Sequence, residues 1–225
     1  SADFCPGGRI LFGAGRNKYN MLNCYVLDPE DSVESIGKTI ADMYKISCAG
    51  GGVGFNFSKI RPKGDDIQNI QWSAPGSISV MKMINEIGEH VRAGKNRRTA
   101  LMSILEVSHP DFLEFLSVKL DRKELTNFNI SVAINNRFIS AVENDEDWHF
   151  TFAGRHNKYF CYNVERTNEK GEVDTVMVVA KDEADAVGRA DQNHKVGWTD
   201  TFANAVLTPL KAKDIWERLL DNAVE

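Results

Sequence analysis

The stretch Leu22-Asn23-Cys24-Tyr25-Val26-Leu27-Asp28-Pro29 opens the pattern that decides the fold. Its first six residues are mostly apolar and include aromatic and β-branched side chains, which favour a buried strand. Asp28-Pro29 is a turn signal that ends the strand. The segment after this turn determines whether the next strand of the sheet runs parallel or antiparallel to the first.

An amphipathic helix is predicted over residues 32–47. Ile36 and Ile40 recur at helical spacing, and polar residues separate them. Asp31 is placed to cap the start of this helix, with Glu34 at the position of a capping box. A helix directly after a buried strand is typical of a crossover to a parallel strand.

The next segment is Gly50-Gly51-Gly52-Val53-Gly54-Phe55-Asn56-Phe57-Ser58, a glycine cluster that runs into a short strand. Glycine lets a backbone approach a ligand closely and adopt positive φ. No Gly-Lys-Ser/Thr comes after it, which excludes a P-loop, and the preceding helix argues against a dinucleotide-binding fingerprint. A tight turn and a ligand-contacting loop both remain open as interpretations of the cluster.

Strand and helix continue to alternate up to about residue 142. Ser77 begins a second helix, residues 100–107 and 129–134 are predicted strands, and a short helix begins at Phe138. This alternation indicates an α/β protein, either a layer or a barrel, with parallel strands.

The pattern changes after residue 142. We expect three domain segments, with boundaries at residues 1–142, 143–208 and 209–225. The middle segment is predicted as an inserted β-β-β-α unit, with strands at 148–152, 158–164 and 175–179 and a helix at 182–192. This unit is expected to bury a small core of its own. The last segment is predicted to form a helix over 212–224 that returns to the first.

Composition narrows the functional classes. The chain has 225 residues, 42% of them hydrophobic and 26% charged, which is ordinary for a globular protein and excludes a disordered one. A net charge of −5 disfavours a general nucleic-acid-binding surface. The sequence contains neither an apolar run of the ~20 residues that a membrane helix needs nor a signal-peptide pattern at its start. We therefore expect a cytoplasmic protein with no membrane or nucleic-acid partner.

The chain holds four cysteines, Cys5, Cys24, Cys48 and Cys161, without a Cys-x-x-Cys pair. Neither they nor the histidines have metal-ligand spacing, so no metal site is predicted. In a reducing compartment each cysteine is either a small packed side chain or a working thiol.

A basic segment comes after the second predicted helix. Arg92, Lys95, Arg97 and Arg98 lie among small and polar residues, and guanidinium groups pair well with phosphates. The segment is either a solvated basic loop or an anion-binding loop at an edge where α/β proteins place ligands.

Several motifs occur together in a fixed order. They are Pro6-Gly7-Gly8-Arg9-Ile10-Leu11, the strand at 22–27 with Asp31-Ser32, the glycine cluster at 50–58, Arg61-Pro62-Lys63-Gly64, Arg97-Arg98-Thr99-Ala100, His109-Pro110-Asp111, Asn127-Phe128-Asn129-Ile130-Ser131-Val132 and Asp214-Ile215-Trp216. Their order and spacing, over residues 5–142 and in the last helix, resemble the catalytic subunit of ribonucleotide reductases. The motifs are most similar to those of the adenosylcobalamin-dependent class.

The resemblance implies the first half of a ten-stranded α/β barrel that reduces ribonucleotides to deoxyribonucleotides under allosteric dNTP control. It implies that Cys24 is one of the two thiols that reduce the substrate and end as a disulfide. By the same resemblance Asn23 and Gly52 lie near the substrate, and Asp31 and Arg61 bind the effector. The loop that couples the two sites would comprise Ala93, Gly94, Lys95, Asn96, Arg97 and Arg98.

Part of the family pattern is missing. The radical-carrying cysteine of the family lies in an Asn-x-Cys-x-Glu motif, and this motif does not occur here. The second reducing cysteine is also expected beyond residue 225. The chain is thus expected to be one part of a split enzyme, a processed product or a fragment of a longer protein.

The partners implied by the resemblance are a ribonucleotide substrate, a dNTP effector, adenosylcobalamin in the assembled enzyme, a thioredoxin-type or dithiol reductant, and a complementing chain that carries the rest of the barrel. Two alternatives remain open at this point. One is a reductase that takes its radical from a separate metal-containing subunit, and the other is a non-catalytic nucleotide-binding regulator.

Overall fold

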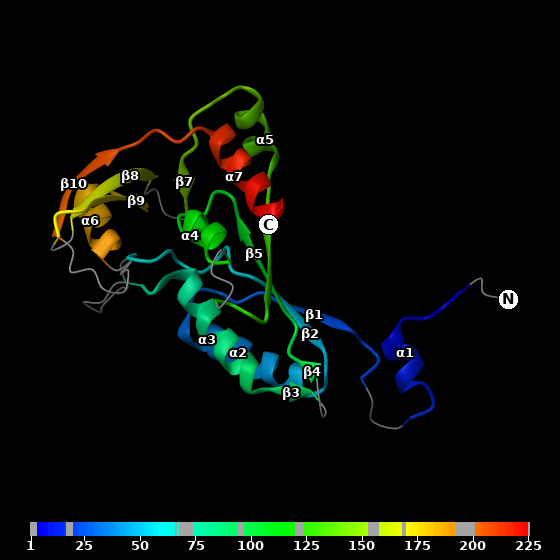
Figure 1. Ribbon diagram of the computed structural model, residues 1–225. Coiled ribbons are helices and arrows are strands. Elements are labelled where there is room, and N and C mark those ends of the chain that lie inside the picture. The colour runs from blue at the N-terminus through cyan, green and yellow to red at the C-terminus, as the bar shows by residue number, and fades with distance from the viewer. Residues whose placement is uncertain are drawn as a thin grey trace. The chain divides into compact units, whose positions relative to one another are not determined.

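The computed structural model describes residues 4–16, 20–65, 67, 74–93, 97–119, 124–152, 158–167, 170–191 and 201–224 (Figure 1). The chain divides into two compact units, each built from three segments. The first comprises Ser1–Ile60, Ser79–Ile104 and Arg122–Ser131, and the second comprises Arg61–Ile78, Leu105–Asp121 and Val132–Glu225.

A four-stranded sheet has the order β1 (Cys24–Leu27), β2 (Gly52–Asn56), β5 (Leu101–Glu106) and β6 (Phe128–Ala133). β1 pairs with β2 in parallel, and β2 pairs with β5 in parallel. The amide of Leu101 donates to the carbonyl of Asn127 at 2.9 Å, and the amide of Val107 donates to that of Ala133 at 3.1 Å, so β6 also runs parallel to β5. The predicted α/β class with parallel strands is confirmed.

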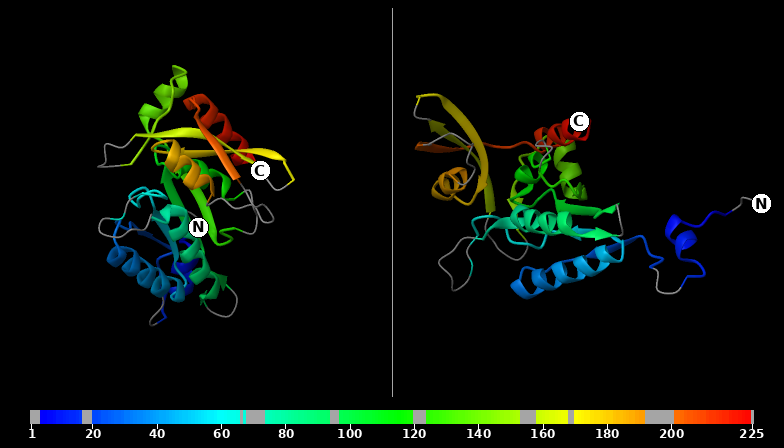
Figure 2. Two further views of the ribbon diagram at one scale, coloured as in Figure 1. Left: turned by 90° about the vertical axis from the view of Figure 1, so that its left-hand side faces the viewer. Right: turned by 60° about the horizontal axis from the view of Figure 1, so that its bottom comes forward.

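Helices α2 (Val33–Cys48) and α3 (Gly76–His90) are the crossovers between these strands, as the periodicity predicts. They lie side by side in each view (Figure 2). The predicted cap of α2 is wrong by one residue. Ser32, not Asp31, is the N-cap, and its hydroxyl accepts from the amide of Ser35 at 3.1 Å. Glu34 therefore lies in the first turn rather than at a capping-box position.

The first unit buries one face of its part of the sheet. Val53 and Phe55 of β2 alternate inward, and the rings of Phe55, Phe57 and Phe128 lie with centroids 5.5 to 6.4 Å apart. On β1 the burial is weaker, and Val26 is 82% exposed. The aromatic cluster thus fixes the register, because a slip by one residue would expose it.

Two short elements of the first unit are absent from the sequence-based prediction. Residues 8–11 lie in a helix, α1 (Gly8–Gly13). The basic segment forms the ends of a hairpin, with β3 (Arg92–Ala93) antiparallel to β4 (Arg97–Arg98). Gly94, Lys95 and Asn96 of the predicted coupling loop lie outside the described residues.

The second unit contains a small antiparallel sheet around β8 (Lys158–Thr167). β8 pairs with β7 (Phe150–Thr151), β9 (Val173–Ala180) and β10 (Thr201–Leu207). Helix α6 (Glu183–Asp191) packs on β8, β9 and β10, as the grouping in Figure 1 shows. The predicted β-β-β-α unit therefore lacks one strand of the observed unit, β10. The pairing of β10 shifts register between Ala203 and Ala205, and such a bulge interrupts the alternation by which a strand is found in a sequence.

Two core clusters of the second unit bear on the predicted boundaries at residues 142 and 208. One cluster belongs to β8, β9 and α6 and includes Val164, Val178 and Ala186. The other joins side chains from 143–208, such as Phe150 and Tyr159, to side chains of the helices α4 (Phe112–Ser117), α5 (Asn136–Glu143) and α7 (Ala212–Val224). The boundaries stay a prediction, but a deletion of 143–208 would open this second cluster.

Cys161 makes a pH-dependent contribution to the stability of this core. Burial raises the pKa of its thiol to about 11. Between the ordinary pKa near 9 and this value the unfolded chain has released a proton that the folded chain keeps, so stability falls as pH rises. Between pH 8.5 and 11 we expect the free energy of unfolding of the parent chain to fall by up to ~2 kcal/mol more than that of Cys161→Ala. Denaturant titrations at a series of pH values measure the free energy of unfolding of both proteins. An identical pH dependence in the two would contradict this prediction.

Two further properties concern the described residues only. No helix among them is long and apolar enough to cross a membrane. Within the same residues, no group of three or more His, Cys, Asp or Glu side chains is arranged to hold a metal ion.

Candidate functional site

A cavity of about 580 Å³ in the first unit surrounds the thiol of Cys24. Asn23, Cys24 and Gly52, the three residues predicted at the substrate, all line it, together with Thr99 and Ala100. The cavity has the size of a small-molecule site. The structure thus brings the predicted substrate residues together at one place.

Parallel pairing of β1 with β2 sets the geometry of this cavity. Cys24 lies opposite Gly52 in the register, and the amide of Gly52 donates to the carbonyl of Asn23 at 2.8 Å. A Cβ atom on Gly52 would lie 3.6 Å from Sγ of Cys24 and 3.4 Å from the carbonyl oxygen of Ala100. Glycine at position 52 therefore leaves open the space beside the thiol.

The turn before β2 requires glycine for two reasons. Gly50 has φ of +77°, a conformation that side chains rarely adopt. A Cβ atom on Gly51 would lie 2.7 Å from Cγ2 of Ile46 and 2.9 Å from Cε2 of Tyr25. Because Gly50, Gly51 and Gly52 also line the cavity, the cluster is both a tight turn and a cavity wall.

Arg9 of α1 is a cavity residue for which sequence patterns predict no role. Its guanidinium donates to the carbonyl oxygens of Gly50 and Ala49, the latter at 3.4 Å. These carbonyls come directly after the C-terminus of α2, where a cation is favourable. Arg9 belongs to a motif used for the family resemblance, but a single arginine among glycines carries no signal for this contact.

The two predicted effector residues fall in different units, Asp31 in the first and Arg61 in the second. Asp31 is half-buried. Near it in the chain, Asp28 and Glu30 both accept from the ammonium group of Lys59, at 2.7 and 2.6 Å. Hydrogen bonds to these two carboxylates raise the pKa of Lys59 above its ordinary value.

The segment before Asp31 is thus fixed at the surface by paired charges. Arg61 is also half-buried, and it begins the polar loop at 61–65.

The loop at 61–65 is held by hydrogen bonds within the second unit. The carboxylate of Asp111, which is 4% exposed, accepts from the amide of Lys63 at 3.0 Å and from the amide and hydroxyl of Ser77 at 2.9 and 2.8 Å. Buried Asp65 accepts from the ammonium group of Lys181 at 2.7 Å. His109-Pro110-Asp111 therefore anchors the Arg61-Pro62-Lys63-Gly64 motif.

Comparison with known proteins identifies the family. Residues 22–225 match the family described as ribonucleotide reductase, barrel domain. The chain is similar to a vitamin B12-dependent ribonucleoside-diphosphate reductase of Thermoplasma acidophilum, with 39% identity over 147 residues, 65% of this chain and 19% of that protein.

A protein of the same name from Mycobacterium tuberculosis is 36% identical over 63% of this chain and 20% of its own length. The ribonucleoside-diphosphate reductase large subunit of Monkeypox virus is 31% identical over 64% of this chain and 20% of its own length.

The aligned part of this chain spans about a fifth of each of these relatives. The family match, in contrast, covers most of the chain, from the strand that carries Cys24 to the last helix. It includes the cavity residues Asn23, Cys24 and Gly52 and the loop anchored by Asp111. The chain belongs to the ribonucleotide reductase barrel-domain family.

Proposed function

We propose that this chain supplies the substrate pocket and one of the two reducing thiols of a ribonucleotide reductase. The observation that carries the proposal is the cavity in which Asn23, Cys24 and Gly52 meet. Replacing the 2′-hydroxyl of a ribose by hydrogen consumes two electrons and two protons and releases water. Two thiols that become a disulfide supply both electrons and both protons. Cys24, exposed at the cavity, is one of this pair.

The substrate in this proposal is a ribonucleoside diphosphate, the class named for the relatives from Thermoplasma acidophilum and Mycobacterium tuberculosis. Its ribose lies in the space that Gly52 leaves beside the thiol. The amides and carbonyls of the glycine turn offer polar contacts for hydroxyl groups. Asn23 adds a side chain that both donates and accepts hydrogen bonds.

The remainder of the ten-stranded barrel comes from a complementing chain in this proposal. The support is the weakly covered face of the first unit's sheet, where Val26 of β1 is 82% exposed and Met102 of β5 is 39% exposed. Val26 and Met102 lie on either side of Gly54 in the register, and apolar side chains left open on one face of a sheet are typical of a surface that another segment covers. The complementing chain also carries the Asn-x-Cys-x-Glu cysteine and the second reducing thiol. A thioredoxin-type or dithiol reductant then reopens the disulfide.

Adenosylcobalamin is the proposed cofactor of the assembled enzyme, because the two B12-dependent relatives carry that name. When bound, it supplies the radical. A corrin ring with its nucleotide tail is larger than the cavity of about 580 Å³ around Cys24. The Cys24 cavity therefore does not fit the cofactor, and we place the cofactor site in the complementing part.

Regulation is assigned to Asp31, Arg61 and the hairpin loop at 93–98. The pairing of β3 with β4 fixes the two points at which this loop joins the fold. A basic loop of this kind suits the phosphates of a nucleotide. Loops that adopt different conformations with different ligands are a common switching device. The loop is proposed to couple effector binding to the conformation of the substrate pocket.

Two glycine variants test the substrate pocket. In the complemented enzyme we expect Gly52→Val to raise KM for the ribonucleoside diphosphate at least tenfold, because its methyl groups fill the space beside Cys24. Gly37→Val is the control, since Gly37 lies on α2, does not line the cavity, and a Cβ atom there would meet nothing within 4 Å. Equal KM values for the two variants would contradict the assignment.

The effector role of Asp31 is separable from helix capping because the cap is its neighbour. We expect Ser32→Ala to lower the free energy of unfolding by about 1 kcal/mol and to leave effector binding unchanged. Asp31→Ala should do the reverse, with little loss of stability and at least a fivefold weaker dNTP affinity. Denaturant titration and calorimetric titration of dATP and dTTP into the complemented enzyme measure both. Unchanged effector affinity in Asp31→Ala would remove Asp31 from the effector site.

A further inference from the structure

The turn that forms one wall of the Cys24 cavity consists of three consecutive glycines, Gly50, Gly51 and Gly52. Glycine has more backbone freedom than any other residue, so a run of three is costly to hold in one conformation. The position of this wall, and with it the space beside the thiol, therefore depends on the contacts that other residues make with the turn.

Backbone hydrogen bonds hold the amide side of this turn. The amides of residues 50, 51 and 52 each donate to a backbone carbonyl, at 2.8 to 2.9 Å. The carbonyls of Ala49 and Gly50, in contrast, accept no backbone amide within the part of the chain that the structure describes. They come directly after the C-terminus of α2, where partial negative charge accumulates. A cation that also donates hydrogen bonds is the partner that suits these two oxygens.

Arg9 of α1 is that partner. Its Nη1 donates to the carbonyl of Ala49 at 3.4 Å, and its Nη2 donates to the carbonyl of Gly50. A planar guanidinium presents its donors in a rigid fork, so one side chain bridges two successive carbonyls. The two contacts join positions 40 and 41 residues apart in the chain, and they tie α1 to the turn.

The shape of the turn matches this guanidinium. A Cβ atom on Gly50 would lie 2.5 Å from Nη2 and 2.9 Å from Nη1 of Arg9. The guanidinium thus occupies the place that a side chain at position 50 would fill. Because Gly50 also has φ of +77°, glycine is required there by its backbone conformation and by the packing of Arg9.

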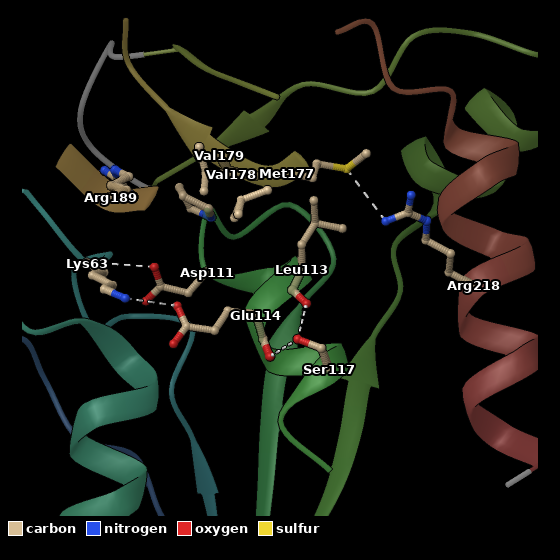
Figure 3. A pocket seen from close by; sticks show the side chains of 12 residues that line it. Lys63, Asp111, Leu113, Glu114, Ser117, Met177, Val178, Val179, Arg189 and Arg218 are labelled. Carbon is tan, nitrogen blue, oxygen red and sulfur yellow. Dashed lines mark hydrogen bonds and ion pairs between the residues drawn. The ribbon is translucent and has the colours of Figure 1, made fainter. Parts of the chain in front are cut away.

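Arg9 is the one charged residue among the described residues that line the Cys24 cavity, and none of the described carboxylates pairs with it. A cavity of about 360 Å³ in the second unit differs in this respect. There the ammonium group of Lys63 lies 3.7 Å from the carboxylate of Glu114, and Asp111 adds a second carboxylate (Figure 3). The guanidinium of Arg9 is therefore committed to the turn rather than to an acidic partner.

From these contacts we propose that Arg9 is a positioning residue of the substrate pocket, which holds the glycine turn in the conformation that leaves space beside Cys24. Its effect on catalysis rests on the proposed reduction at Cys24. Arg9 acts through the backbone at 49–52 and does not touch the reacting atoms. Without the bridge the turn populates other conformations, and a substrate that requires the pocket-forming one binds more weakly by the fraction of chains that have it. Saturating substrate restores that conformation, so KM changes and kcat does not.

Hydrogen exchange in the 225-residue chain, measured by NMR, tests the first step without any catalysis. In Arg9→Ala we expect the amides of residues 50–52 to exchange at least tenfold faster than in the parent chain, and the amides of β8 to keep their rates. Lys45→Ala is the matched control, because Lys45 is another cation in the last turn of α2, pairs with Asp42 at 3.3 Å and does not line the cavity. It should change exchange at 50–52 by less than twofold.

Two results of the exchange experiment would overturn the proposal. One is equal exchange at residues 50–52 in Arg9→Ala and Lys45→Ala. The other is faster exchange throughout the chain in Arg9→Ala, with β8 included, because Arg9 would then stabilise the fold as a whole rather than the turn.

Kinetics of the complemented enzyme test the second step. Arg9→Ala should raise KM for the ribonucleoside diphosphate at least fivefold and change kcat by less than twofold. Arg9→Lys keeps the charge but has one nitrogen in place of two, so its KM should lie between those of Arg9→Ala and the parent. An unchanged KM in Arg9→Ala, or a parent-like KM in Arg9→Lys, would refute the bridging role.

The two measurements together separate this proposal from its alternatives. A higher KM in Arg9→Ala without faster exchange at residues 50–52 would indicate a direct contact with the phosphates and would overturn the positioning role. Faster exchange at 50–52 together with a parent enzyme that forms no deoxynucleotide would refute the proposed function and leave the hold of Arg9 on the turn established.

Discussion

Replacement of Cys24 by serine is expected to abolish multiple turnover in the complemented enzyme, with a fall of at least a thousandfold in deoxynucleotide formation. Serine has nearly the same shape and also hydrogen-bonds, so the substrate should still bind with a KM within about threefold of the parent value. It cannot form a disulfide, so the two electrons that ribose reduction consumes are not available. The measurement is deoxynucleoside diphosphate formed per chain, with adenosylcobalamin and a dithiol reductant present.

Cys48→Ser is the control for this experiment. Cys48 is an exposed thiol at the last residue of α2, and it does not line the Cys24 cavity. Its replacement should leave the turnover rate within a factor of two. Full activity of Cys24→Ser, or an equal loss in Cys48→Ser, would exclude Cys24 as a reducing thiol.

The second large effect concerns stability rather than chemistry. Asp111→Ala is expected to lower the free energy of unfolding by about 3 kcal/mol, because it removes an ionised acceptor and leaves the amides of Lys63 and Ser77 without it. Both amides lie in a part of the second unit that is largely buried. Since the 61–65 loop depends on this carboxylate, the protection of the loop amides from hydrogen exchange should fall as well.

Asp111→Asn is the matched variant for this prediction. It keeps one acceptor oxygen of similar position, so we expect roughly half of the loss. Glu217→Ala, at an exposed position of α7, should change stability by less than about 0.5 kcal/mol. If Asp111→Ala lowered the free energy of unfolding no more than Glu217→Ala does, the Asp111 carboxylate would contribute nothing to stability.

Much of the fold can be predicted from local sequence patterns. The strands at Cys24 and Gly52 and the helix between them are recognisable because apolar spacing and the Asp28-Pro29 turn agree with the tertiary structure. The long last helix, α7, is predicted with its observed bounds, since its apolar positions lie on one face.

Other features depend on information that local patterns lack. Asp31 and Ser32 are both good cap residues, and only the backbone conformation decides that Ser32 takes that position. The strand β10 is hidden by a bulge at Asn204 and by alanines of low strand preference. For β10 the deciding contacts are those with β8, which lies far away in the chain.

The candidate site, too, can be predicted only in part from the sequence. Asn23, Cys24 and Gly52 are identified through motifs that resemble a family, and the parallel register of β1 and β2 then brings them to one cavity. Arg9 lies in one of these motifs, but the motif predicts no role for its side chain. That role follows only from the structure, in which its guanidinium donates to the carbonyl oxygens directly after α2.

Thiol trapping after a single turnover tests the central claim most directly. The complemented enzyme is reduced, freed of external reductant and given one equivalent of ribonucleoside diphosphate, and its cysteines are then alkylated and measured by mass spectrometry. We predict that Cys24 becomes protected from alkylation in proportion to the deoxynucleotide formed, while Cys48 stays fully reactive. The protection should be reversed by a dithiol. Deoxynucleotide formed in one equivalent with Cys24 still fully alkylated would contradict the assignment of this cavity as the site of ribose reduction.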